Sequence, residues 1–279
     1  MKKLSVLTAL IVVLSASLVS CEKDKEETPT LQEVPVEILN KLEQAGFNVT
    51  DQPPIAYEEG YIVEGDIFIP EKDILNTTIG KSLDLQSKQY STDNLVATNG
   101  SRTITVYARQ GGFFGFNSAT SQGIDLAIQR YNAENLELNF QRISSSSAAD
   151  IRITRLNFFL EFFGVLGSAG FPTASGDPFD QIQLSGRLTN SGFDVNGIAT
   201  IVAHEMGHCI GFRHTDYFDR SVSCGGATQN EGDGGVGANQ IPGTPAGASV
   251  EDGSWMLACS DGGDRPFNED DVTALNFLY

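Results

Sequence analysis

The chain has 279 residues, and 40% of them are hydrophobic, which suits either one sizeable domain with a smaller segment or a single large domain. The formal net charge is −18, and lysine and arginine together number only 18. This balance excludes the clustered basic footprint of a nucleic-acid-binding protein, so we expect no nucleic-acid partner.

The first twenty residues have the pattern of a targeting signal. Two lysines precede an apolar stretch over residues 7–18, which is too short for a comfortable transmembrane span. The signal ends in LVSC at residues 18–21, which resembles the lipobox of bacterial lipoproteins. That resemblance implies a signal peptide over residues 1–20, a lipidated Cys21, and an anchored location in the bacterial cell envelope, at the outer membrane or cell surface. An ordinary signal peptide with a chance cysteine is the alternative, and release from the membrane is also open.

Residues 21–30 follow the signal and carry many charges and a proline, which predicts a disordered tether. Apolar residues at helical spacing then predict a short helix over residues 31–46, with Gly46 as its stop.

The next region, residues 61–70, has the sequence YIVEGDIFIP, which indicates a strand interrupted by Gly65. Residues 71–100 are polar and poorly periodic, and we interpret them as a linker. Residues 31–100 are therefore a candidate pro-segment with its linker, and residues 101–279 form the main domain.

In the main domain, apolar periodicity predicts an α+β fold with a small mixed sheet. Strands are expected over 103–108, 136–143 and 151–156, with two short ones in GVLGSAGFP and QIQLSG, and helices over about 120–133, through the histidines, and in NEDDVTALNFLY at the C-terminus.

All three histidines of the chain lie in HEMGHCIGFRH, residues 204–214. His204 and His208 are four residues apart, so a helix places both on one face. Gly211 can adopt the left-handed conformation that turns the chain, and His214 then returns as a third ligand. Three neutral imidazoles with an open fourth position are typical of a catalytic zinc site, so we expect one bound Zn²⁺.

Glu205 follows the first histidine and does not ligate in this pattern. We expect it to take the proton of the attacking water as general base and to pass that proton to the leaving amine. The motif predicts a zinc-dependent endopeptidase that hydrolyses peptide bonds in protein or peptide substrates. The alternative is a catalytically quiet surface lipoprotein that uses the same fold to bind a partner.

The motif resembles that of the metzincin metallopeptidases, whose second mark is a methionine turn beneath the zinc. Met256 in SWML is the candidate, with an ordinary core residue as the alternative. Within the metzincins the chain resembles the dual-action HEIGH metallopeptidases, although it reads HEMGH. The resemblance implies a metzincin-like catalytic domain, with an active-site helix and an irregular C-terminal subdomain that ends in a helix. Ala258 stands where some metzincins carry a tyrosine, so that oxyanion helper is absent.

Two further expectations concern the substrate cleft. Residues 167–171 are a candidate upper rim, where an extended substrate would pair with an edge strand, although an ordinary glycine-rich loop is equally open. YIVEGDI resembles the FxGD-type stretch of astacin pro-segments, with Val63 in place of phenylalanine. That resemblance implies that Asp66 is a latency ligand at the fourth zinc position; a structural strand with a surface aspartate is the alternative.

Three cysteines remain in the main domain and allow three pairings. We favour Cys224 with Cys259, which leaves Cys209 as a small buried helix residue, and three free thiols are the alternative. Acidic loops around Asp233, Asp261 and Asp264 lack the spacing of a calcium loop, so calcium binding is without support. We expect a monomer that meets the membrane only through its N-terminal lipid.

Overall fold

The structure, a computed structural model, describes residues 33–76, 89–232 and 235–279, and the predicted signal, the tether and Cys21 lie outside these ranges. The strands are β1 Ile55–Tyr57, β2 Gly60–Val63, β3 Ile67–Pro70, β4 Tyr90–Ser91, β5 Arg102–Ala108, β6 Leu138–Ile143, β7 Ile151–Arg155, β8 Gly167–Ala169, β9 Gln181–Leu184 and β10 Asn239–Gln240. The helices are α1 Val36–Gln44, α2 Glu71–Asn76, α3 Ser118–Ala133, α4 Phe158–Phe162, α5 Val195–Ile210, α6 Ser221–Cys224 and α7 Glu269–Leu278.

Eight of these strands form one mixed sheet in the order β1-β2-β3-β8-β9-β7-β5-β6. The strands β6, β5, β7 and β9 run parallel to one another, and β8 is antiparallel to β9. This arrangement confirms the expected α+β fold with a mixed sheet, an active-site helix and a C-terminal helix. The sheet is larger than predicted because β1, β2 and β3 extend it.

The N-terminal strands join the sheet where β3 pairs with β8, in parallel, with Ile67 opposite Ala169. The predicted single strand over residues 61–70 is wrong in one respect, because it is two strands of a hairpin. Glu64 and Gly65 have positive φ angles of 52° and 95° and turn the chain between β2 and β3. Glycine adopts this conformation without a Cβ penalty, so Gly65 marks a turn and not an interruption.

The region interpreted as a linker, residues 71–100, contains α2 and the short strand β4. The strand β4 pairs with β10, which lies in the C-terminal half of the chain. Apolar periodicity did not predict these elements, nor β1, α4 or α6, because none exceeds six residues. Such short elements are defined by tertiary pairing and packing rather than by a repeating pattern.

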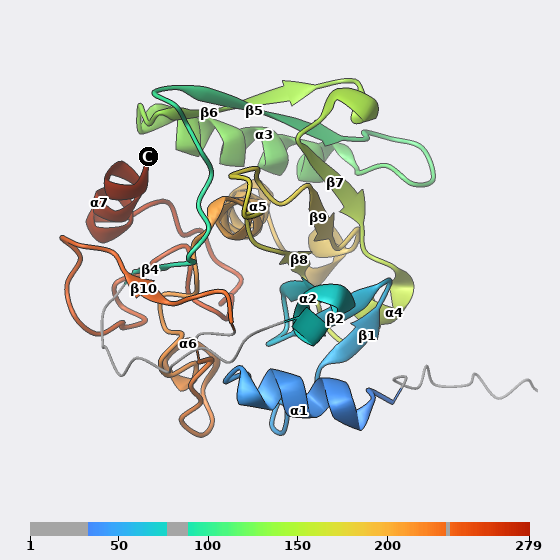
Figure 1. Cartoon of the computed structure of the whole chain (residues 1–279). Helices are drawn as coiled ribbons and strands as arrows, with labels where there is room; N and C mark the ends of the chain where they lie inside the picture. Colours follow the sequence, from blue (N-terminus) through green and yellow to red (C-terminus); the bar gives the residue numbers. More distant parts are fainter. Residues whose placement is uncertain (1–32, 77–88, 233–234) are drawn as a thin grey trace, which may run out of the picture. The chain divides into compact units, whose positions relative to one another are not determined.

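The main core lies between the sheet and the helices α3 and α5, which pack against each other beside it (Figure 1). Fourteen consecutive residues of α5, Gly197–Ile210, are buried, so this helix is central rather than amphipathic. A second core, between α1, α2 and the hairpin of β2 and β3, includes Leu42, Val63, Ile67 and Ile74. Within the described ranges, no helix is both long enough and apolar enough to cross a bilayer.

Candidate metal centre

Helix α5 carries the first two histidines into the interior. It begins at the N-cap Asp194, whose side chain accepts a hydrogen bond from the backbone N–H of Gly197, 2.9 Å away. Its last two turns hold His204 and His208 on one face, with their Nε2 atoms 3.1 Å apart. Both side chains are buried, so the helix presents two imidazoles to one point in the interior.

The helix ends at Gly211, which has a φ angle of 107°. The N–H groups of Gly211 and Phe212 donate to the carbonyls of His208 and Gly207, each over 2.9 Å, as in a left-handed C-terminal cap. This turn brings His214 back toward α5, with its ring centroid 4.9 Å from that of His208. The geometry is the one that the spacing HxxGxxH predicted.

The fourth member of the group comes from the hairpin. Asp66 ends the turn between β2 and β3, and its Oδ2 lies 3.5 Å from Nε2 of His204 and 3.3 Å from Nε2 of His214. One ligand atom from each of these four residues lies within 4.8 Å of all the others. Among the described residues this is the single group of histidine, cysteine and carboxylate side chains arranged to hold a metal ion.

The other ring nitrogen of each histidine is fixed by an oxygen atom. Nδ1 of His204 is 2.9 Å from the carbonyl of Trp255, and Nδ1 of His208 is 2.9 Å from the carbonyl of Phe212. A carbonyl can only accept, so Nδ1 carries the proton in both rings and Nε2 presents its lone pair. Such outer contacts orient metal-ligating histidines.

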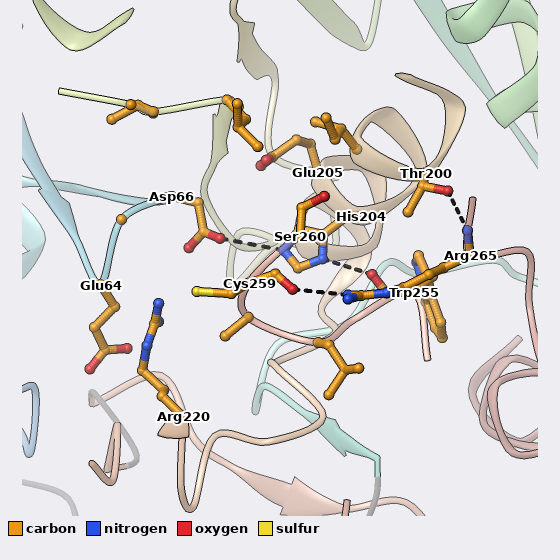
Figure 2. A pocket seen from close by; sticks show the side chains of 18 of the residues that line it. Glu64, Asp66, Thr200, His204, Glu205, Arg220, Trp255, Cys259, Ser260 and Arg265 are labelled. Carbon is orange, nitrogen blue, oxygen red and sulfur yellow. Dashed lines mark hydrogen bonds and ion pairs between the residues drawn. The ribbon is translucent and has the colours of Figure 1, made fainter. Parts of the chain in front are cut away.

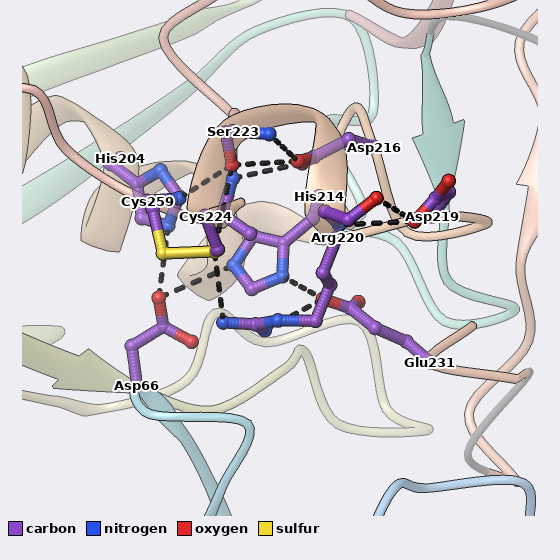
Figure 3. The surroundings of a disulfide bond; sticks show 12 residues. Asp66, His204, His214, Asp216, Asp219, Arg220, Ser223, Cys224, Glu231 and Cys259 are labelled. Carbon is purple, nitrogen blue, oxygen red and sulfur yellow. Dashed lines mark hydrogen bonds and ion pairs between the residues drawn. A yellow bond between two sulfur atoms is a disulfide. The ribbon is translucent and has the colours of Figure 1, made fainter. Parts of the chain in front are cut away.

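The third histidine has a carboxylate instead. Nδ1 of His214 donates to Oε1 of Glu231 over 2.5 Å, and the same Oε1 lies 2.8 Å from Arg220 (Figure 3). The second oxygen of Glu231 is 3.4 Å from Arg213. Glu231 was not predicted from the sequence, since a single glutamate in a glycine-rich stretch carries no motif.

The carboxylates around His214 favour a positive charge on its imidazole. Burial lowers its pKa, but Glu231 and Asp66 outweigh burial and raise it to about 10. Burial and the two neighbouring imidazoles instead keep the pKa of His208 well below its usual value, so that ring is neutral. Burial alone would raise the pKa of Asp66, but His214 and His204 lower it well below the ordinary range.

The donor set fits a divalent metal ion. Nε2 of His214 and Oδ1 of Asp66 are buried, and neither has a hydrogen-bond partner within the described part of the chain. Buried polar atoms without partners are costly unless something else satisfies them. Transition metals such as zinc prefer donors of this kind, three imidazoles and one carboxylate. The outer contacts of the histidines hold the imidazole nitrogens in place.

Glu205 lies beside the group and is 2% exposed. Burial raises its pKa well above the ordinary value, and Asp66 adds to the rise. Its Oε2 has no hydrogen-bond partner among the described residues. A Cβ at Gly167 of β8 would lie 2.8 Å from Cγ and Cδ of Glu205 and closer still to its Oε1, so a larger residue there would displace this carboxylate.

Met256 is fully buried against the helix between the two histidines. A Cβ at Gly207 would lie 2.5 Å from its sulfur and 3.2 Å from Nε1 of Trp255. The carbonyl of Met256 also accepts from the N–H of Thr215, next to His214, over 2.8 Å. The structure thus packs the predicted methionine turn against α5 at Gly207, between His204 and His208 in the sequence.

Cys224 and Cys259 form a disulfide, and Cys209 is a free buried cysteine of α5. The bridge ties α6 to the segment after Met256. Asp216 strengthens the same link, since it accepts from Ala258 N–H over 2.9 Å and from Ser223 Oγ over 2.6 Å. Asp261 and Asp264, in the acidic loop beyond, pair with Arg265 and Arg130.

A cavity of about 250 Å³ opens beside the metal centre (Figure 2). Its lining includes His204, Glu205, the approach to β8 at residues 164–167, and the segment 257–260 after the methionine turn. The hairpin contributes Glu64 and Asp66 to the same cavity. The candidate rim strand β8 is already paired with β3 here, and Ala169 N–H donates to the carbonyl of Asp66 over 3.1 Å.

A family model described as dual-action HEIGH metallo-peptidase matches residues 62–279. No curated protein matches the chain. Two solved structures, "Structure of Myroilysin" and "Crystal structure of myroilysin", are 16% and 15% identical to it, each with a TM-score of 0.29. The similar parts cover 43% and 44% of this chain and 46% and 56% of those chains, so the chain spans about half their length.

Proposed function

Because the chain belongs to the dual-action HEIGH metallo-peptidase family, we propose that it is a zinc endopeptidase that hydrolyses peptide bonds in protein substrates. The observation that carries the proposal is the convergence of three histidines on one point, with the buried carboxylate of Glu205 beside them. The histidines are His204, His208 and His214. The resemblance to this family, which rests on HEMGHCIGFRHTDYF, the methionine turn followed by Cys259 and the C-terminal NEDDVTALNFLY, is confirmed by the match over residues 62–279.

His204, His208 and His214 would hold the zinc ion through Nε2, with Trp255, Phe212 and Glu231 fixing the opposite nitrogens. A bound zinc ion supplies Lewis-acid polarisation of the scissile carbonyl and a lowered pKa for a water molecule. Met256 packs against the helix that carries two of the ligands, where its sulfur fills the space that Gly207 leaves open.

Glu205 holds and moves the proton. Its buried carboxylate has a pKa raised well above the ordinary value by burial, which brings it closer to the range in which one group can accept and then donate a proton. It accepts the proton of the attacking water and delivers it to the amine that leaves. Gly167 keeps the space around this carboxylate open on the side of β8.

The hairpin of β2 and β3 keeps the full-length chain latent in this proposal. Two observations support it: Asp66 is the fourth member of the ligand group, and β3 covers the edge of β8. With zinc held by the three histidines, the Asp66 carboxylate would compete with water for the metal, and a strand on β8 would compete with an extended substrate. Removal of the hairpin would free both places, so residues 31–100 act as a pro-segment and residues 101–279 as the catalytic domain.

We also propose that the chain is anchored to a membrane of the bacterial cell envelope. The LVSC signal supports cleavage of residues 1–20 and lipidation of Cys21, which would anchor a monomeric peptidase in the bacterial cell envelope. Globomycin, which blocks lipoprotein signal cleavage, would test this, because the precursor should accumulate with its signal intact.

The activity is tested by incubating the zinc-loaded full chain, with and without Asp66→Ala, with a mixture of unstructured peptides and mapping the products by mass spectrometry. We expect internal cuts that a chelator abolishes and that added zinc restores. Intact peptides in every sample would overturn the proposal.

A further inference from the structure

We infer that the cavity beside the metal centre selects substrates with an acidic side chain next to the scissile bond, and that Arg265 determines this preference. The inference rests on the proposed peptidase function and names its substrate class. Arg265 lines the same cavity as His204 and Glu205, so a side chain adjacent to the reacting bond would reach it (Figure 2).

Arg265 is held rigidly relative to the first metal ligand. Its backbone N–H donates to Oγ1 of Thr200 over 2.8 Å, and Thr200 lies one turn before His204 on α5. The guanidinium also donates through NH1 to the carbonyl of Cys259 over 3.0 Å. Helix α5 and the segment after the methionine turn therefore fix the position of this cation.

The guanidinium of Arg265 retains donors for a ligand. The Cys259 carbonyl is a neutral partner. Within the described part of the chain, the charged partner of the guanidinium is Asp261, 3.1 Å from NH2. The Asp261 side chain is 56% exposed, whereas that of Arg265 is 8% exposed. Because Asp261 keeps much of its contact with water, its pairing with Arg265 is partly screened, and a substrate carboxylate that is itself desolvated in the cavity can compete for the same cation.

The second cation of the cavity, Arg220, is already committed. It lies 2.8 Å from Glu231, which in turn holds His214. Arg220 therefore supports the metal ligands, although its positive charge also contributes to the potential in the cavity. Arg265 is left as the cation that a substrate side chain can engage.

The charge of the residues that line the cavity contrasts with the net charge of the whole chain. The chain carries a net charge of −18, yet outside the hairpin the charged residues that line the cavity are the two arginines Arg220 and Arg265 and the proposed base Glu205. The hairpin lines one side of this cavity and contributes two carboxylates, Glu64 and Asp66, of which Glu64 is 1% exposed. The two arginines thus already lie in a cavity shared with acidic side chains, which is the chemistry that we infer for a substrate.

The test compares cleavage by the Asp66→Ala full chain, zinc-loaded, and by the same chain after brief trypsin treatment quenched with a serine-protease inhibitor. Each is given matched peptides that differ only by glutamate or glutamine beside the cut. We expect kcat/KM to favour glutamate by about tenfold or more. Arg265→Gln should reduce this ratio to about one, and Arg265→Lys should restore part of it.

Two further variants separate specificity from folding. Asp261→Asn removes the competing carboxylate without touching Arg265, so the preference for glutamate should increase. Arg142→Gln removes an arginine that pairs with Asp125 outside the cavity and should leave the preference unchanged.

Cleavage without acidic preference, or a preference that survives in a folded Arg265→Gln chain, would overturn this inference and leave the peptidase proposal intact. No cleavage by any form would overturn the proposed function, and the inference with it.

Discussion

Nδ1 of His214 lies 2.5 Å from Oε1 of Glu231, and both side chains are fully buried. This carboxylate is the point where the third metal ligand meets two arginines, since Arg220 and Arg213 also contact it. Glu231 therefore links the orientation of a metal ligand to a buried charge network, which a carbonyl partner could not do.

Glu231→Gln should weaken zinc binding by about 10- to 100-fold, as loss of an outer partner of a metal-bound histidine commonly does. It should also lower the free energy of unfolding by about 3 kcal/mol or more, because two buried arginines lose their counter-charge. Competition with a chromogenic chelator measures the first effect and urea unfolding the second. The exposed Glu251→Gln is the control, and a Glu231→Gln chain with wild-type zinc affinity would contradict the positioning role.

Asp66→Ala should raise the peptidase activity of the full-length chain, because it removes the carboxylate that lies among the three histidines. Initial rates on a quenched fluorescent peptide provide the measurement. Glu59→Ala changes an exposed carboxylate in the turn between β1 and β2 and should have no effect. Equal rates for Asp66→Ala and wild type would show that Asp66 does not maintain latency.

Gly207→Ala tests the contact between α5 and the methionine turn. Helix propensity alone would favour alanine by about 1 kcal/mol. We expect destabilisation by about 1–3 kcal/mol instead, because the added Cβ would lie 2.5 Å from the sulfur of Met256. Thermal unfolding with and without zinc would measure the loss of stability in the variant. An increase in stability would mean that the methionine is not packed against this position.

Asp271 predicts a dependence of stability on pH. Burial raises its pKa to about 7, although hydrogen bonds from Asn268 and Trp255 oppose the rise. In the unfolded chain the group loses its proton near pH 4, so between pH 4 and 7 the folded state binds more protons. The free energy of unfolding should therefore fall as pH rises through this window, by up to about 4 kcal/mol from this group.

Asp271→Asn should flatten that dependence, because an amide cannot ionise. Urea unfolding at a series of pH values between 4 and 8 measures the slope for both chains. An equal slope in the variant would mean that other groups dominate the pH dependence.

Residue spacing predicted the parts of the site that lie within one continuous segment. His204, His208, Gly211 and His214 follow from helical geometry and one left-handed residue, and Met256 follows from the family resemblance. The long elements α3, α5 and β5 have enough apolar residues to show their period.

The features that spacing could not predict depend on contacts between distant segments. Glu231 lies 17 positions after His214 with no periodic pattern between them, and Gly167 matters only because Glu205 packs against it. The pairing of β3 with β8 spans about a hundred residues and rests on a single register pair, Ile67 with Ala169. Backbone pairing of this kind is decided by the surrounding fold and leaves little trace in local sequence.

The most direct test of the peptidase proposal compares Glu205→Gln with its parent in the Asp66→Ala full chain. Both proteins are loaded with zinc, their metal content is measured, and cleavage of one peptide is followed. We expect one zinc ion per chain in each and a loss of kcat of about 100-fold or more in the Glu205→Gln chain. Equal cleavage by the two zinc-loaded proteins would contradict the proposal that Glu205 carries the proton.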